Sequence, residues 1–126
     1  MYAGIADADI SVFENYLSRA EVGVIIGTAP DEWWENADDA LSAMRAQMTN
    51  SEGSVDLIAG DVHAYEHQDV GWVADRPQLR VGDTDVECRQ TSVFVRENGS
   101  WRLVQQHFSI GVPNEEVFGK DAAKLG

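Results

Sequence analysis

Residues 63–67 read HAYEH, a His-x-x-Glu-His spacing that could bind a metal ion. On a helix, this spacing places two imidazoles and a carboxylate on one side, as in one class of zinc peptidase. On a strand, His63 and His67 would lie about 13 Å apart at about 3.3 Å per residue, which zinc–nitrogen bonds of about 2 Å cannot span. Gly60, the turn residues after His67 and the β-rich run that follows favour a strand. We therefore expect no metal site here.

A second candidate site lies in the stretch RQTSVFVRENGSWRLVQQHFSIGVP, residues 89–113. Asn98-Gly99 between two apolar runs predicts a hairpin with a two-residue turn. A constant register then makes three cross-strand pairs: Phe94 with Leu103, Ser92 with Gln105, and Gln90 with His107. One face collects Gln90, Ser92, Phe94, Trp101, Leu103, Gln105, His107 and Ser109. This mixture of aromatic, neutral polar and imidazole groups suits a pocket wall, although the polar groups could equally satisfy one another.

The opposite face of this hairpin is mainly apolar, with long polar side chains at intervals. Its apolar members include Val93, Val95, Val104 and Phe108, with Ile110 at the end of the strand. Such a face suits a sheet surface that a second subunit covers, so the pattern predicts a homodimer.

Proton transfer has two candidate residues. His107 has a reference pKa near 6.5, which suits a general base, although a histidine on a partly apolar face is often structural. Asp75 and Arg76 are adjacent on a predicted strand, so only one of them faces inward. An inward Asp75 could act as a base, whereas an inward Arg76 could hold a carboxylate. The sequence leaves this choice open.

Three tryptophans could also line a site. Trp72 suits the sheet core or a pocket wall. Trp33 and Trp34 are adjacent, so a helix cannot bury both in the same direction. One of them is expected in the core, and the other at a pocket mouth or an interface.

The first part of the chain shows helical patterns with one short strand between them. Ile10–Arg19 has a helical apolar stripe, and the run Val22–Ile26 is β-rich. TAPDEWWENADDALSAMRAQM then predicts a helical segment that begins near Pro30, breaks in a left-handed conformation at Asn36 and continues along Leu41, Met44 and Met48.

The rest of the chain consists of four apolar runs separated by turn residues: Val55–Glu66, Val70–Arg80, Glu87–Arg96 and Trp101–Val112. They predict an antiparallel four-stranded sheet packed against the N-terminal helices. Because helices and strands segregate, the fold class is α+β, with a single domain over residues 1–126.

Composition narrows the classes of function. The formal net charge of −13 disfavours nucleic acid and anionic membranes as partners. No apolar run is long enough for a spanning helix, and the first residues do not resemble a signal peptide. The single cysteine, Cys88, fits a reducing, cytoplasmic compartment and is expected to be a small buried residue. Neither a glycine-rich phosphate loop nor a metal-ligand cluster is present, so we expect no cofactor.

Three stretches resemble a known family: GTAPDEWWENADDAL, GDVHAYEHQDVGWVADRP and RQTSVFVRENGSWRLVQQHFSIGVPNEE. They are similar to the SnoaL-like branch of the nuclear transport factor 2 (NTF2)-like superfamily, over roughly residues 10–118. The Trp101–Ser109 pattern is also similar to the last strand of the association domain of calcium/calmodulin-dependent kinase II. The resemblance implies a cone, in which a strongly bent, mostly antiparallel sheet wraps N-terminal helices around a cavity, and it implies that dimers are common.

The resemblance carries over to only a few positions. His107 matches the last-strand histidine, Ser92 stands where the kinase domain has a pocket arginine, and Arg76 loosely matches another. Only nine residues precede Ile10, so the first helix of the family is expected to be absent. Asn36 stands where relatives usually carry glycine.

Two functions remain open from the sequence. The first is a small-molecule-binding protein, in which His107 or Asp75 moves a proton as in a lyase or isomerase while Gln90 and Gln105 orient the ligand. Its expected ligand-binding residues are Trp33, Trp34, Trp72, Arg76, Gln90, Ser92, Phe94 and Gln105. The second is a dimeric binding or assembly module without catalysis, which some members of the superfamily are.

Overall fold

A long antiparallel hairpin, β7 (Thr84–Glu97) and β8 (Ser100–Ile110), forms the centre of the sheet in the computed structural model, which describes residues 23–51 and 55–126. The main sheet has the order β2-β1-β8-β7-β5-β4. Its other strands are β1 (Ile25–Ile26), β2 (Trp33–Trp34), β4 (His63–His67) and β5 (Val70–Asp75). Two further strands, β3 (Val55–Ile58) and β6 (Gln78–Val81), pair with each other, and β6 pairs with the first part of β7.

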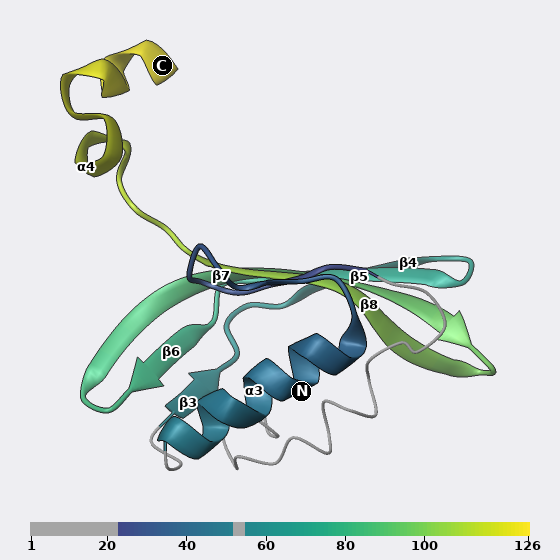
Figure 1. Ribbon diagram of the computed structural model, residues 1–126. Coiled ribbons are helices and arrows are strands. Elements are labelled where there is room, and N and C mark those ends of the chain that lie inside the picture. Colours follow the sequence, from purple (N-terminus) through teal and green to yellow (C-terminus); the bar gives the residue numbers. More distant parts are fainter. Residues whose placement is uncertain (1–22, 52–54) are drawn as a thin grey trace.

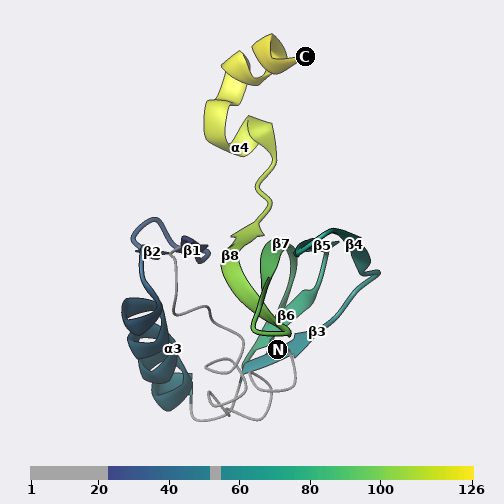
Figure 2. The same cartoon turned by 90° about the vertical axis from the view of Figure 1, so that its right-hand side faces the viewer.

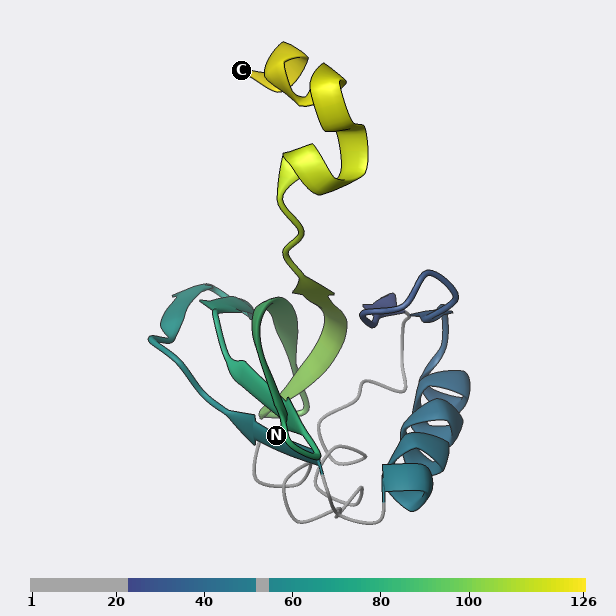
Figure 3. The same cartoon turned by 90° about the vertical axis from the view of Figure 1, so that its left-hand side faces the viewer.

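The sheet is strongly curved and mostly antiparallel, as predicted (Figure 1). Helix α3 (Ala37–Ser51) lies on one side of it. The last residues form α4 (Asn114–Phe118) and the 3-10 helix η1 (Gly119–Leu125), which extend away from the sheet on the side opposite α3 (Figures 1, 2 and 3). We call the side of the sheet that faces α3 the helix face and the other side the open face.

The apolar core joins α3 to the central hairpin. Its buried members are Ile25, Ala40, Leu41 and Leu103, and Trp34, Ala37, Met44 and Phe94 pack against them. The predicted stripe of α3 is thus confirmed for Leu41 and Met44, whereas the side chain of Met48 lies outside the described residues.

 The core therefore sits between α3, the short strand β1 and the middle of the hairpin.

The hairpin turn matches the prediction. Asn98 has φ 51° and Gly99 has φ 82°, the two left-handed residues that a type I′ turn requires. Glu97 pairs with Ser100, and Phe94 pairs with Leu103. The register close to the turn is therefore the expected one.

Beyond Leu103 the predicted register is wrong, because β8 contains a β-bulge. Val93 pairs with Gln105, which leaves Val104 as an extra residue. Every later pair is shifted by one: Ser92 faces Gln106, Thr91 faces His107, and Gln90 faces Phe108. Side chains alternate along a strand, so the shift moves Gln105 and His107 off the face that carries Gln90 and Ser92.

The bulge lies where another part of the chain approaches β8. A Cβ on Gly23 would collide with the carbonyl oxygen of Val104, so only glycine allows this approach. Directly after it, the Gln106 N–H donates to the Val24 carbonyl at 3.2 Å, and β1 pairs with β8 in parallel. The change of register thus accompanies the addition of β1 to the sheet.

Two of the four predicted strands are each divided in two. The run Val55–Glu66 breaks between β3 and β4, and the run Val70–Arg80 breaks between β5 and β6. Pro77 causes the second break, because it has no N–H to donate to the ladder. At the first break, a Cβ on Gly60 would collide with the carbonyl oxygen of Arg76, so the two breaks lie against each other.

The predicted helix around Trp33 and Trp34 is also wrong, since both residues form β2 and pair with β1. Asn36 is not left-handed. Instead its Oδ1 accepts the Asp39 N–H at 2.9 Å, the bond of a helix cap, and α3 begins directly after it. The predicted helix Ile10–Arg19 and the expected absence of a preceding helix lie outside the described residues.

The turn generates a test of the hairpin. Gly99→Ala places a Cβ on a left-handed residue, which costs about 1–2 kcal/mol. We expect urea denaturation to show a free energy of unfolding lowered by that amount. Ser100→Ala, at the exposed neighbour, should change it by less than about 0.5 kcal/mol. Equal stability of the two variants would contradict the turn geometry.

Candidate functional site

Four polar side chains are buried on the helix face of the central strands. The exposed fractions are 5% for Asp75, 4% for Gln90, 1% for Ser92 and 7% for Gln106. They come from three neighbouring strands, because Asp75 pairs with Gln90 and Ser92 pairs with Gln106. We call these four residues the polar cluster.

Hydrogen bonds hold the polar cluster in place. Gln106 Nε2 donates to Gln90 Oε1 at 3.0 Å and to Ser92 Oγ at 3.5 Å. The Gly60 N–H donates to both carboxylate oxygens of Asp75, at 3.1 and 3.3 Å. Burial of polar groups is costly unless they are bonded, and these contacts offset part of that cost.

Apolar groups adjoin the polar cluster on the same face. Phe94 and Leu103 follow Ser92 and Gln106 toward the turn, and Phe108 pairs with Gln90 in the other direction. A carboxylate, two amides and a hydroxyl bordered by aromatic and aliphatic surface can orient a ligand carbonyl and exchange a proton with it.

The structure therefore brings together four of the residues that the sequence predicted: Asp75, Gln90, Ser92 and Phe94. Of the adjacent pair Asp75 and Arg76, Asp75 is buried and Arg76 is exposed. Gln106 was missed. Its type is the same as that of Gln105, so only the bulge shows which of the two shares a face with Gln90 and Ser92.

Four predicted site residues are not part of the polar cluster. His107, Gln105, Trp72 and Arg76 are exposed and belong to the open face by strand alternation. The Trp72 ring stacks on Tyr65, with ring centroids 5.9 Å apart.

Trp33 and Trp34 separate as expected for adjacent residues. Trp34 packs against the core, whereas Trp33 is exposed and its Nε1 donates to Glu35 at 3.1 Å. Neither belongs to the polar cluster.

The HAYEH stretch forms strand β4, as predicted, and all five of its residues are exposed. His63 lies 3.8 Å from Asp61, measured between Nε2 and Oδ2. Within residues 23–51 and 55–126, no group of three His, Cys, Asp or Glu side chains is arranged to hold a metal ion.

Cys88 is buried and its Sγ lies 3.8 Å from the Val86 carbonyl oxygen. Burial, with a smaller contribution from Glu87, raises the pKa of the Cys88 thiol. A thiol with a raised pKa is a poor nucleophile at neutral pH, which agrees with the structural role expected for Cys88.

A family model for the SnoaL-like domain matches residues 1–113. The chain belongs to the SnoaL-like domain family. No curated protein matches this SnoaL-like protein. In the part of the chain that the structure describes, no helix is long and apolar enough to cross a membrane.

Solved structures share the fold of this SnoaL-like protein. An NTF2-like protein of unknown function from Pseudomonas putida has a TM-score of 0.81 at 14% identity, covering 91% of this chain and 82% of its own. A candidate dehydratase of the NTF2-like family from Streptomyces avermitilis has a TM-score of 0.73 at 18% identity, covering 89% and 90%. A candidate ketosteroid isomerase from Parabacteroides distasonis has a TM-score of 0.67 at 14% identity, covering 88% and 82%. At these identities the likeness shows the fold, which is the expected NTF2-like cone.

Because of the bulge, Gln106 is buried and hydrogen-bonded whereas the adjacent Gln105 is exposed. Gln106→Ala removes a donor to Gln90 and Ser92, so we expect the free energy of unfolding to fall by about 1–3 kcal/mol. Gln105→Ala changes an exposed residue and should cost less than about 0.5 kcal/mol. Urea denaturation of both variants measures the difference. If Gln105→Ala lowered the free energy of unfolding more than Gln106→Ala, the result would contradict the shifted register and support the one predicted from the sequence.

Proposed function

We propose that this SnoaL-like protein binds a small organic molecule against the helix face of its sheet and that Asp75 exchanges a proton with it. The observation that carries the proposal is the burial of the Asp75 carboxylate beside the amides and hydroxyl of the polar cluster. A buried carboxylate next to neutral hydrogen-bonding groups is a suitable general base, because the neutral groups can hold a carbonyl oxygen while the carboxylate takes a neighbouring proton.

The relatives agree with this class of chemistry. Two solved neighbours are a candidate dehydratase and a candidate ketosteroid isomerase, and both reactions move a proton on carbon. The reaction class that we propose is therefore that of a lyase or isomerase acting on a cyclic or aromatic ketone or alcohol. His107, the other candidate base, is on the open face and has no part in this proposal. A cytoplasmic location remains a proposal based on the single reduced cysteine.

Proton exchange in D₂O tests the role of Asp75. In a panel of cyclic ketones, at least one should exchange its α-protons faster in the presence of the protein, as followed by proton NMR. Asp75→Asn keeps an oxygen that can accept the Gly60 N–H but removes the base, so we expect the rate to fall about 100-fold or more.

Asp61→Asn is the matched control, because Asp61 is exposed and should leave the exchange rate unchanged. Thermal unfolding of both variants verifies the fold. An Asp75→Asn variant that exchanges protons at the wild-type rate, or a panel without any accelerated ketone, would contradict the proposal.

A second function is supported by the open face. Tyr65 is 55% exposed and Trp72 is 43% exposed, and both lie beside the exposed Val70 and the half-buried Val93. Such an apolar patch on a sheet suits the interface of a homodimer. The patch differs from the predicted one, because Phe108 pairs with Gln90 and belongs to the helix face. The alternative function is a dimeric binding or assembly module.

Light scattering tests the dimer. Trp72→Glu places a charge in the apolar patch, so we expect the mass of a dimer for the wild type and that of a monomer for the variant. Val81→Glu adds the same charge at an exposed valine of β6 and should leave the dimer intact. A wild-type monomer at about 100 μM would exclude a stable interface.

A further inference from the structure

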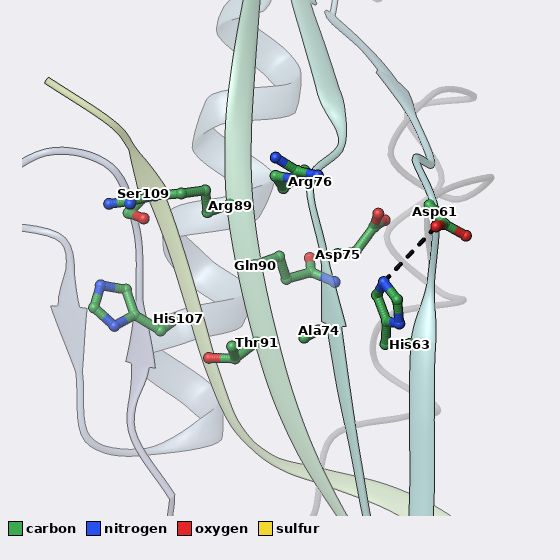
Figure 4. A pocket seen from close by; sticks show the side chains of 10 residues that line it. All are labelled: Asp61, His63, Ala74, Asp75, Arg76, Arg89, Gln90, Thr91, His107 and Ser109. Carbon is green, nitrogen blue, oxygen red and sulfur yellow. Dashed lines mark ion pairs between the residues drawn. The ribbon is translucent and has the colours of Figure 1, made fainter. Parts of the chain in front are cut away.

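The open face has a pocket whose lining side chains differ from those of the polar cluster. Its volume is about 440 Å³. Ten residues line it: Asp61, His63, Ala74, Asp75, Arg76, Arg89, Gln90, Thr91, His107 and Ser109 (Figure 4). Asp75 and Gln90 border both places, so the pocket and the polar cluster are neighbours. The other eight are on β4, β5, β7 and β8 or directly beside them.

The pocket gathers cationic and hydrogen-bond-donating groups from four strands. His63, Ala74, Thr91 and His107 form one row across the sheet, according to the strand pairing. Arg76, Arg89 and Ser109 lie at one end of the pocket, next to that row (Figure 4). Two guanidinium groups, two hydroxyls and two imidazoles thus border one hollow.

These cations are exceptional in such an acidic chain, which has 22 acidic and 9 basic residues. Most other cations of the described residues have partners: Arg80 binds Asp85 at 2.7 Å, Arg96 approaches Asp69 at 4.0 Å, and Lys124 binds Asp121 at 3.3 Å. Arg45 and Arg102 also have interactions. Lys120, in the C-terminal 3-10 helix far from the sheet, is the exception. Within the described ranges, neither Arg76 nor Arg89 makes a side-chain hydrogen bond or an ion pair.

The pairing of the strands places these two arginines side by side. Asp75 pairs with Gln90, so Arg76 and Arg89 occupy the next positions on the adjacent strands β5 and β7. Like charges on neighbouring strands destabilise a sheet unless an anion neutralises them. Two carboxylates also border the pocket, but neither lies within ion-pair distance of Arg76 or Arg89 in the described residues: Asp61 lies against His63, and Asp75 accepts the Gly60 N–H.

We infer that the pocket binds a small organic anion and that Arg76 and Arg89 hold its carboxylate or phosphate group. Guanidinium groups bind such oxyanions through paired hydrogen bonds, and the hydroxyls of Thr91 and Ser109 add donors nearby. The volume exceeds that of a bare ion and falls within the range of small-molecule sites. This site is independent of the proton chemistry proposed for Asp75.

Isothermal titration with inorganic phosphate and with citrate, in a phosphate-free buffer, tests the site on the full chain. We expect at least one of the two anions to bind the wild type. Arg76→Gln and Arg89→Gln should each weaken binding about tenfold or more. Arg80→Gln is the matched control, because it removes the same charge outside the pocket and should leave the affinity unchanged. NMR shifts of the Thr91 and Ser109 amides should locate the anion.

A double variant, Arg76→Gln with Arg89→Gln, shows whether a loss of anion binding could come from unfolding. Removing two like charges should leave the anion-free protein at least as stable as the wild type. Three results would overturn the site: no binding of either anion, an equal loss of affinity in Arg80→Gln, or a double variant that loses only its dimeric mass. The last result would mean that the two arginines bind an acidic segment of a second copy of the chain and not a small anion. Arg76→Gln and Arg89→Gln should keep the wild-type rate of proton exchange, which separates this inference from the proposed proton transfer.

Discussion

Val104 is the one residue of β8 that has no partner on β7, and Gly23 closely approaches its backbone. An extra residue in a strand exchanges the faces of everything that follows it. Gln106 consequently joins Gln90 and Ser92 on the helix face, while His107 joins Thr91 on the open face. This single extra residue decides which functional groups the second half of β8 contributes to each side of the sheet.

The two faces that result carry different kinds of polar group. The helix face holds one carboxylate with neutral amides and a hydroxyl, and these groups are buried and bonded to one another or to the backbone. The open face holds the guanidiniums and imidazoles, where water can solvate them. This division follows the cost of burial, because an unpaired buried charge is far more expensive than a bonded amide.

Much of the fold could be predicted because its signals are local. Asn98-Gly99 defines the central turn, and alternation defines the strands on either side as far as Leu103. The strand conformation of HAYEH followed from its neighbours in sequence. The sequence could not tell which of Asp75 and Arg76 is buried, since both are polar and adjacent on a strand.

The errors arose where distant segments decide the local structure. The bulge lies where Gly23 and β1, which are far from Val104 in the sequence, approach β8, and the adjacent glutamines give no pattern that reveals it. Trp33 and Trp34 follow helical signals at Pro30, yet pairing with β1 draws them into a strand. Tertiary pairing overrides propensity in both cases.

Asp75 also fastens the connection between β3 and β4, because its carboxylate accepts the Gly60 N–H. A proton taken up by that carboxylate turns one of its acceptor oxygens into a donor. In the reaction proposed above, the residue that exchanges the proton is therefore also the one that holds the corner at Gly60.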